Sequence, residues 1–231
     1  MVAPMRMHAT SLVETQAEAE RWQAMVRASG LFASGRALTR AEVSASALAV
    51  KPTLLLQQLR TLKQDEGLVW LDADSQISEG GEERFGDYQA LLADAPGGLL
   101  GFELIGTPTR RHAPAALLDA LKADVWMRNA SLVSAAVFLA RPCAAAETAL
   151  ARWQELAAAA PPWLSASGAA GEMALFSVLL RRAGGATLCA EIYREDISSI
   201  TRLFHPNLLG ASVFATPAVA RFWTAAGVRA P

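Results

Sequence analysis

Residues 51–72 read KPTLLLQQLRTLKQDEGLVWLD, and this stretch decides the predicted fold. Pro52 suits the first turn of a helix, because its ring presets φ and the turn needs no N–H there. Three leucines follow at the spacing that places one apolar stripe along a helix: Leu55, Leu59 and Leu62. Gly67 stands where such a helix stops, and residues 68–71 are apolar and partly β-branched, as in a strand. The stretch therefore predicts a helix over 52–63 and then a strand.

Two further helices are predicted upstream of this stretch. Apolar residues recur at close to helical spacing over 14–28, and Gly30 stands where that helix would stop. Thr39 precedes a second helical stretch over 40–47, and Glu42 follows Thr39 by three residues, which is the capping-box pattern. The N-terminal part of the chain therefore predicts three helices followed by a strand.

A turn and a return strand follow. Asp72-Ala73-Asp74-Ser75 is typical of a turn, and Gln76-Ile77 continues as a short strand. Three helices followed by such a hairpin resemble the winged helix-turn-helix superfamily over residues 14–78. The resemblance implies that residues 52–63 form the recognition helix and that the hairpin is the wing.

The rest of the chain predicts a second domain. Glycine-rich breaks at both ends mark residues 81–98 as a linker. Short apolar runs beyond it predict strands at 99–105, 131–139 and 187–193. Helical spacing predicts helices at 115–128, 144–160, 171–183 and 217–226. We therefore predict an α+β fold class, with an N-terminal winged helix-turn-helix domain at residues 10–80 and an α+β domain at 99–231 built on a smaller α/β-type sheet.

The distribution of charge argues against contact with DNA. The chain has 21 basic and 22 acidic residues, a formal net charge of −1, so no global field attracts it to nucleic acid. The predicted wing and its exit, residues 72–87, carry six acids and one base. A wing that contacts phosphate should be basic. A ligand-responsive, DNA-binding transcriptional regulator is therefore the alternative function and not the first choice.

The leucines of the predicted recognition helix favour a peptide or protein partner. Leu54 and Leu56 point away from the core stripe, so they need cover from either the second domain or a bound chain. The precursor-recognition modules of ribosomal-peptide (RiPP) biosynthesis resemble this layout, and the resemblance implies that an extended peptide adds a strand to the wing. We therefore predict a non-catalytic recognition subunit, such as the precursor-binding partner of a methanobactin-type modifying enzyme. The predicted partner-binding residues are Leu54, Leu56, Gln57, Trp70 and Leu71.

Motifs of catalysis, cofactor binding or metal binding do not appear in the sequence. Cys143 and Cys189 lack the spacing of a zinc site, and the three histidines are scattered. Glu103 and Glu191 each lie in a predicted strand, where they either share an acid–base site or face solvent from a half-open sheet. The alternation of apolar neighbours favours the second interpretation. We expect no cofactor and no metal, and the balance favours a protein that is not an enzyme.

The sequence predicts a soluble, cytoplasmic protein without a membrane partner. Residues 1–19 hold a single base, Arg6, and no long apolar run, so they predict neither a signal peptide nor an anchor. The longest apolar stretch, 132–140, is far shorter than the roughly 20 residues that a membrane span needs.

Overall fold

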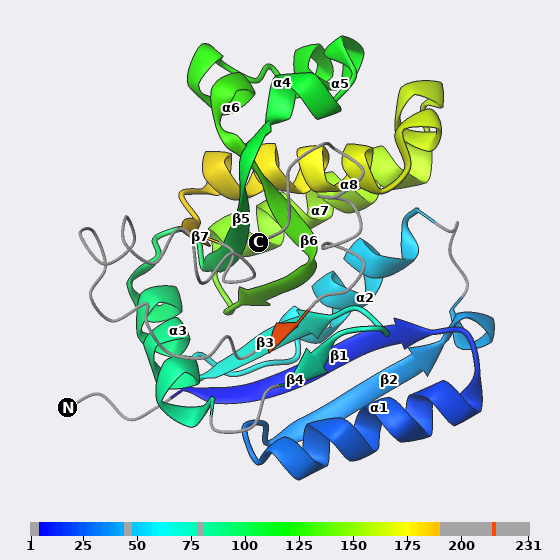
Figure 1. The fold of residues 1–231 in the computed structure, drawn as a ribbon, viewed down its shortest axis with the longest axis vertical. Coiled ribbons are helices and arrows are strands. Elements are labelled where there is room, and N and C mark those ends of the chain that lie inside the picture. Colours follow the sequence, from blue (N-terminus) through cyan, green and yellow to red (C-terminus); the bar gives the residue numbers. More distant parts are fainter. Residues whose placement is uncertain (1–4, 44–47, 78–80, 190–213, 216–231) are drawn as a thin grey trace.

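The structure is a computed structural model that describes residues 5–43, 48–77, 81–189 and 214–215 (Figure 1). Its strands are β1 (Arg6–Val13), β2 (Ser34–Thr39), β3 (Glu66–Leu71), β4 (Gln76–Ile77), β5 (Leu99–Pro108), β6 (Ser131–Ala140), β7 (Ala186–Cys189) and β8 (Phe214–Ala215). Its helices are α1 (Gln16–Ser29), α2 (Val50–Leu59), α3 (Glu82–Asp94), α4 (Thr109–His112), α5 (Ala115–Ala120), α6 (Val125–Asn129), α7 (Ala144–Ala159) and α8 (Pro162–Ala183), with a 3-10 turn at Arg40–Glu42.

Six of these strands form one mixed sheet in the order β2-β1-β3-β6-β5-β7. β1 is parallel to its neighbours β2 and β3. β6 is antiparallel to both β3 and β5, and β7 lies parallel to β5 at the edge. Every residue of β3 is buried, because a strand in the middle of a sheet with helices on both faces has no open side. β4 and β8 pair with each other in a separate, two-stranded sheet.

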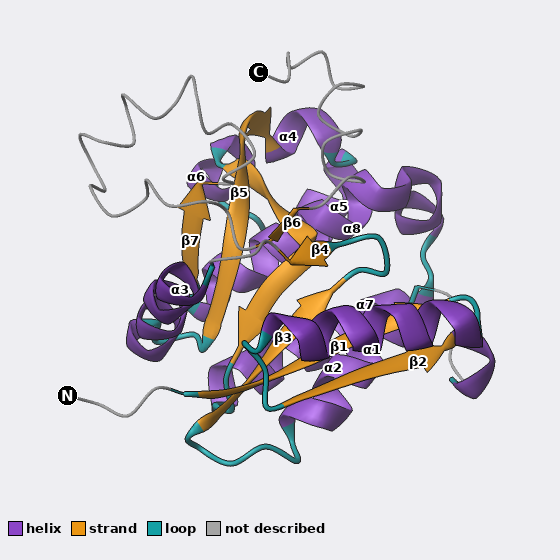
Figure 2. Cartoon of the chain, turned by 60° about the horizontal axis from the view of Figure 1, so that its bottom comes forward, coloured by secondary structure: helices purple, strands orange, loops and turns teal. Residues whose placement is uncertain are grey.

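Helices cover both faces of the six-stranded sheet (Figures 1 and 2). α1 links β1 to β2, and α2 leads back past β1 to β3. Two right-handed crossovers that run in opposite directions place their helices on opposite faces. α7 packs against α2 and α8, and α8 packs against β6, so these three helices form the layer opposite α1. Within the described ranges, no helix is both long and apolar enough to cross a bilayer.

Aromatic side chains tie the second half of the sheet to its helices. Phe138 of β6 lies 4.4 Å from Phe176 of α8, measured between ring centroids. Trp153 of α7 lies 5.2 Å from the same Phe176 ring. All three side chains are fully buried. On the other face, Tyr88 of α3 packs edge-on against Phe102 of β5 at 5.2 Å.

The first predicted helix forms as its local signals indicate. The stretch predicted over 14–28 is α1. Glu18 N donates to Thr15 Oγ1 at 3.2 Å, and Thr15 N donates to Glu18 Oε2 at 3.1 Å, which completes a capping box. Gly30 ends the helix with φ 67°, in the left-handed region that favours glycine.

The predicted winged helix and the α+β fold class are wrong. Residues 6–13 and 34–39, for which the sequence predicted no strand, form β1 and β2 and join β3 in a parallel sheet. The hairpin expected of a wing is absent from the described residues, since β4 pairs with β8 and not with β3. Gly67 does not end a helix but lies within β3, where a Cβ atom would come within 2.6 Å of Met7 Sδ. The glycine therefore serves the close approach of Met7 to β3.

The sheet contains strands from both sides of the predicted linker at 81–98. Most of that linker is helical, as α3. The strands predicted at 99–105 and 131–139 correspond to β5 and β6. The helix predicted over 115–128 is two short helices, α5 and α6, because Lys122 adopts a left-handed φ of 48° between them.

Two predicted segments reach beyond the described residues. The helix predicted over 217–226 lies outside them entirely. The strand predicted over 187–193 overlaps β7 as far as Cys189, and its remainder lies outside them. The helices predicted over 144–160 and 171–183 correspond to α7 and to the second part of α8.

Candidate functional site

A buried lysine joins three elements at one end of the sheet. Lys51 lies in the first turn of α2, and its side chain is only 12% exposed. Its Nζ lies 3.1 Å from Asp72 Oδ1, just beyond β3, and 3.1 Å from Glu172 Oε1 on α8. The same Nζ donates to the carbonyl oxygen of Ala135 in β6 at 3.1 Å. A single ammonium group therefore satisfies two carboxylates and one carbonyl.

Asp72 is held by its own strand as well as by Lys51. Trp70 Nε1 donates to Asp72 Oδ1 at 2.6 Å. The backbone N–H of Asp72 donates to the carbonyl of Ala136 in β6 at 2.9 Å. Its carbonyl accepts from Ser75 N at 2.9 Å and so closes the turn that carries Asp74. Asp74 is exposed in that turn, two residues after the fixed carboxylate of Asp72.

The two carboxylates determine the charge state of Lys51. Burial alone would lower the pKa of Lys51, because desolvation disfavours the charged ammonium. The charges of Glu172 and Asp72, and their hydrogen bonds to Nζ, outweigh that effect and raise the pKa above its ordinary value of 10.5. Lys51 is therefore a fixed positive charge at neutral pH.

Lys51, Asp72 and Glu172 line a cleft of about 370 Å³. The ends of the three parallel strands meet there, since Leu12 lies in β1, Arg40 follows β2 and Asp72 follows β3. In open α/β sheets, the crevice outside the carboxyl ends of parallel strands is where ligands bind. The other lining residues are Glu14, Leu48, Trp70, Ala73, Asp74, Trp153, Ala157, Leu164 and Leu175.

The lining of the cleft is acidic. Glu14, Asp72, Asp74 and Glu172 supply four negative charges, and Arg40 and Lys51 supply two positive ones, so the formal balance is 2 − 4 = −2. Arg40 Nε pairs with Glu14 Oε1 at 3.1 Å near the ends of β1 and β2. Lys51 pairs with Asp72 and Glu172. The excess of carboxylate suits a ligand that arrives with positive charge or with a bound cation.

The oxygen atoms of Asp72 and Asp74 are the donors that a hard cation prefers. Within the described ranges, no three His, Cys, Asp or Glu side chains converge in the manner of a complete metal site. A Mg²⁺ ion, however, is often held by one or two carboxylates while substrate phosphates supply the other ligands. The pair is therefore suited to a cation that binds together with a phosphate-bearing ligand.

The predicted partner-binding residues lie mostly in the core. Leu54, Leu56, Trp70 and Leu71 are each at most 5% exposed, and Gln57 alone is at the surface. Cover from either the second domain or a bound chain was expected for the two leucines. α2 packs against α7, which lies within the part of the chain predicted as the second domain, so the chain itself supplies that cover. Trp70 is the single member of this set that lines the cleft.

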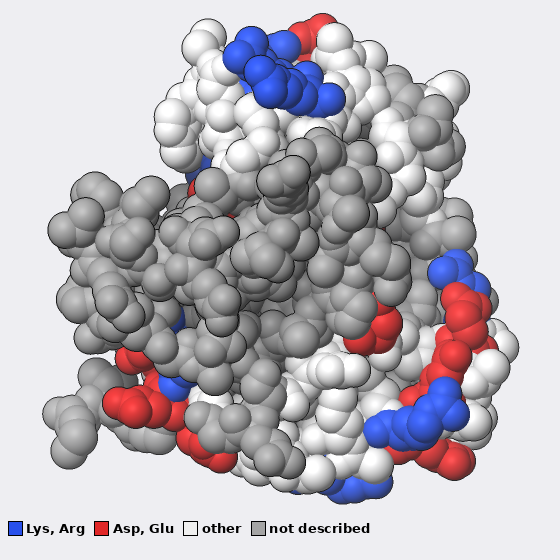
Figure 3. Space-filling model, in the orientation of Figure 1, with Lys and Arg blue, Asp and Glu red and all other residues white. Residues whose placement is uncertain are grey.

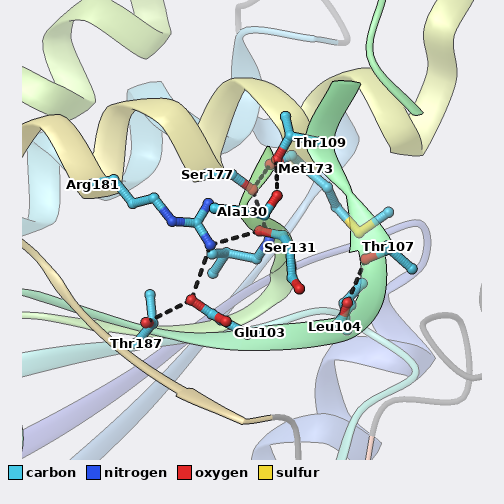
Figure 4. A network of polar contacts seen from close by, with 11 residues as sticks. Glu103, Leu104, Thr107, Thr109, Ala130, Ser131, Met173, Ser177, Arg181 and Thr187 are labelled. Carbon is cyan, nitrogen blue, oxygen red and sulfur yellow. Dashed lines mark hydrogen bonds and ion pairs between the residues drawn. The ribbon is translucent and has the colours of Figure 1, made fainter. Parts of the chain in front are cut away.

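Glu103 lies in a different environment from the cleft (Figure 4). Its Oε1 accepts from Arg181 Nη2 of α8 at 3.0 Å and from Thr187 Oγ1 of β7 at 2.8 Å. The same Arg181 Nη2 donates to the carbonyl of Ser131 at 2.6 Å. Glu191, its suggested partner, lies outside the described residues. Glu103 therefore joins β5 to β7 through Thr187 and to α8 through Arg181, which also contacts β6 at Ser131.

Sequence reasoning missed Lys51, Asp72, Asp74 and Glu172 as site residues. The signal was present: an apolar strand, residues 68–71, ends directly in Asp72-Ala73-Asp74. That pattern was interpreted as an acidic wing tip, because the strand was assigned to a hairpin. At the carboxyl end of a parallel strand, the same two carboxylates face a ligand crevice. Glu172 carries no local signal, since only the packing of α8 brings it to Lys51.

Among the described residues, charged side chains outside the cleft do not form one field on the face shown in Figure 3. Basic side chains gather at the end of the molecule where Figure 1 places α4, which carries the exposed Arg110 and Arg111. Acidic and basic side chains alternate along the opposite end of the view. This mixture agrees with the formal net charge of −1.

No protein-family profile matches the chain, and no curated protein matches it in sequence. Solved structures do match its fold. One is a glycosyltransferase involved in the glycosylation of the major capsid of PBCV-1, with a TM-score of 0.55 and 12% identity over 90% of this chain and 92% of that one. Two weaker likenesses are to mouse xyloside xylosyltransferase 1, with a TM-score of 0.44, 12% identity and coverage of 90% and 82%, and to the galactosyltransferase LgtC, with a TM-score of 0.40, 9% identity and coverage of 90% and 86%.

The first of these likenesses identifies the fold as a GT-A-like, Rossmann-type α/β fold in place of the predicted winged helix. The predicted non-catalytic recognition subunit of a RiPP pathway and the alternative DNA-binding regulator are therefore both wrong, because each was deduced from a winged helix.

Proposed function

We propose that the chain transfers a sugar from a nucleoside-diphosphate-linked donor to an acceptor hydroxyl. The observation that carries the proposal is the Asp72–Asp74 carboxylate pair. The pair lies just beyond the carboxyl end of β3, and Lys51 holds its first member, Asp72, in place. It occurs in a fold that resembles that of a glycosyltransferase. In such a transfer the anomeric C–O bond to the diphosphate breaks, a C–O bond to the acceptor forms, and the acceptor hydroxyl loses its proton. A sugar donor and an acceptor take the place of the peptide or DNA partner predicted from the sequence.

The charge of the cleft supports a donor that binds with a divalent cation. A diphosphate is anionic, and the formal balance of the lining residues is −2, so the two would repel each other without a cation. Asp72 and Asp74 would hold Mg²⁺ or Mn²⁺, which when bound neutralises charge that develops on the leaving diphosphate. The donor set fits, because both side chains are hard oxygen ligands on one turn.

The remaining residues of the cleft position the donor. Lys51 and Trp70 fix the Asp72 carboxylate through two contacts, so its oxygen atoms are oriented before a ligand binds. Arg40, at the end of β2, is within the lining and offers guanidinium N–H donors to phosphate. Leu12 and Leu48 supply the apolar wall against which a nucleobase packs.

Binding of nucleoside diphosphates tests the proposal directly. Isothermal titration of UDP, GDP, ADP and CDP, each with Mn²⁺ and again with EDTA, should show cation-dependent binding of at least one of them. Asp72→Asn and Asp74→Asn remove charge at nearly constant shape and should weaken that binding by roughly tenfold or more. Asp94→Asn, at an exposed position on the last turn of α3, is the matched control and should bind as the wild type does.

Turnover is then measured with the sugar-linked form of whichever nucleotide binds. Release of the nucleoside diphosphate, with or without added acceptor, should be lost in the two Asn variants and retained in Asp94→Asn. Absence of cation-dependent binding for all four nucleotides, or equal binding by the Asn variants, would overturn the proposal. The cytoplasmic location predicted from the sequence stays a prediction.

A further inference from the structure

A second pocket lies at the other end of the α7–α8 pair. It has a volume of about 580 Å³ and is lined by the first half of α7, the last turn of α8 and the end of α5. The cleft proposed for the sugar donor uses the second half of α7 and the middle of α8 instead, through Trp153, Ala157, Glu172 and Leu175. The two spaces therefore share helices but, among the described residues, no lining residue. We call this second space the α7–α8 basic pocket.

Its charged lining residues are all basic. Lys122, Arg152 and Arg182 contribute three positive charges, and no Asp or Glu is among the lining residues that the structure describes. Two of these groups also make contacts within the chain: Arg152 Nη1 pairs with Glu155 Oε2 at 2.6 Å, and Arg182 Nη2 donates to the carbonyl of Lys122 at 2.8 Å. A guanidinium has five N–H donors, so each arginine keeps several for a ligand while these contacts hold it in place.

The rest of the lining is apolar. Leu121 and Leu179 are buried beside the pocket, and small side chains on α7 and α8 leave space between the helices. These small residues are Ala144, Ala145, Ala149 and Ala183. A surface with an apolar floor and a basic rim matches a ligand that has an apolar body and a negative group.

Lys122 carries backbone strain at the edge of this pocket. Its φ of 48° is in the left-handed region, which is unfavourable for a residue with a Cβ atom. A glycine would adopt this conformation without strain and is the usual residue after a helix end. Strained residues cluster at ligand sites, where the surrounding structure holds them. Here the conformation is held by Arg182, and it keeps an ammonium group where glycine would supply none.

We propose that the α7–α8 basic pocket binds a small amphipathic anion, separately from the sugar-donor cleft. A phosphate or carboxylate group pairs with Arg152, Arg182 and Lys122. The apolar body of the ligand lies on the leucine and alanine floor between α7 and α8. The proposal rests on the volume, the charge and the strain of this pocket and does not depend on the proposed transferase function.

Titration of the ¹⁵N-labelled full chain with 1-naphthyl phosphate, without divalent cations, tests the proposal by NMR. The amide signals of Ala145 and Thr148 should shift, and 1-naphthoate, which carries a carboxylate, should shift the same signals. The neutral 1-naphthol should bind roughly tenfold more weakly or worse, because it cannot form charge-assisted hydrogen bonds. Equal affinity for 1-naphthol, or no shift of these signals with either anion, would overturn the proposal.

Variants separate the pocket from other basic surface. The double variant Arg152→Ala with Arg182→Ala should weaken binding of both anions by roughly tenfold or more. The control Arg21→Ala with Arg27→Ala removes two exposed arginines from α1 and should bind as the wild type does. Unchanged binding in the first double variant overturns the proposal. Cation-dependent nucleotide binding in the cleft should be the same in both double variants, so a failure of one proposal does not imply failure of the other.

Lys122→Gly provides a second and independent readout. It relieves the left-handed strain, so the melting temperature should rise, while loss of the ammonium group weakens binding of 1-naphthyl phosphate. A residue with a purely structural role would change the melting temperature alone. Binding that is unchanged in Lys122→Gly would remove Lys122 from the proposed site.

Discussion

Lys51 and Glu172 belong to different helices, α2 and α8, yet Lys51 Nζ lies 3.1 Å from Glu172 Oε1. The same ammonium lies 3.1 Å from Asp72 Oδ1, so one cation links two helices to the end of β3. The ammonium group that orients the proposed ligand-binding carboxylate therefore also ties α2 to α8. Stability and ligand binding should change together when Lys51 is replaced.

Replacement of Lys51 by methionine should destabilise the chain. Lys51→Met keeps the length of the side chain but leaves Asp72 and Glu172 close together without a cation. A fully buried pair broken in this way costs about 3–5 kcal/mol, and the partial exposure of both carboxylates reduces the expected loss to about 2–3 kcal/mol. Urea unfolding measures the loss, with Lys63→Met on the exposed side of the α2–β3 loop as the control. A loss below that of Lys63→Met would show that the ammonium contributes no net stability.

The contribution of Lys51 should disappear at high pH. The pKa of Lys51 is raised in the folded chain above its ordinary value of 10.5, so the folded state binds this proton more tightly than the unfolded state does. The resulting stability is complete below the unfolded pKa and is lost as pH rises through the higher, folded pKa. The difference in unfolding free energy between wild type and Lys51→Met should therefore be constant at pH values well below the ordinary pKa of 10.5, and it should shrink as the pH rises above 10.5. A difference that grows with pH would contradict the assignment.

Leu56 and Gln57 are adjacent on α2 but should differ sharply in their effect on stability. Leu56 is 3% exposed, whereas Gln57 is at the surface. Leu56→Ala should cost about 2–4 kcal/mol, because it opens a cavity in the core. Gln57→Ala should stay within about 0.5 kcal/mol of wild type. Chemical denaturation of both variants decides whether this helix is covered by the chain itself, and similar small losses at both positions would favour an exposed leucine face.

The Glu103–Arg181 ion pair should contribute more to stability than the exposed Glu155–Arg152 pair, although the second pair is the shorter one. The Arg181 side chain is 2% exposed and lies 3.0 Å from Glu103, whereas Arg152 and Glu155 are 43% and 67% exposed and lie 2.6 Å apart. Glu103→Ala removes the Glu103 counter-ion from the buried guanidinium and should cost about 2–4 kcal/mol. Glu155→Ala should cost less than about 1 kcal/mol, since solvent screens the exposed pair. Equal thermal shifts for the two variants would mean that burial does not determine the strength of the Glu103 contact.

Several elements of this fold could be predicted from local sequence because their determinants are local. Thr15, Glu18 and Gly30 cap α1 through contacts within a few residues of each other. The apolar run at 68–71 is a strand as predicted, and Leu55 and Leu59 lie on the buried side of α2. Hydrophobic spacing and capping depend on positions close together in the chain, so the sequence by itself determined these helices and strands.

The tertiary structure alone decided how the strands pair and therefore what the site is. β3 takes β1 and β6 as neighbours, and both pairings join segments far apart in the chain, for which no local pattern exists. The same Asp72-Ala73-Asp74 is a hairpin tip in a winged helix and the mouth of a ligand crevice in a parallel sheet. Glu172 reaches Lys51 only because α8 packs across β6. Local interactions decide whether a segment forms a helix or a strand. The burial of both faces of a sheet depends on the whole chain, and that burial placed the Asp72 and Glu172 carboxylates beside Lys51.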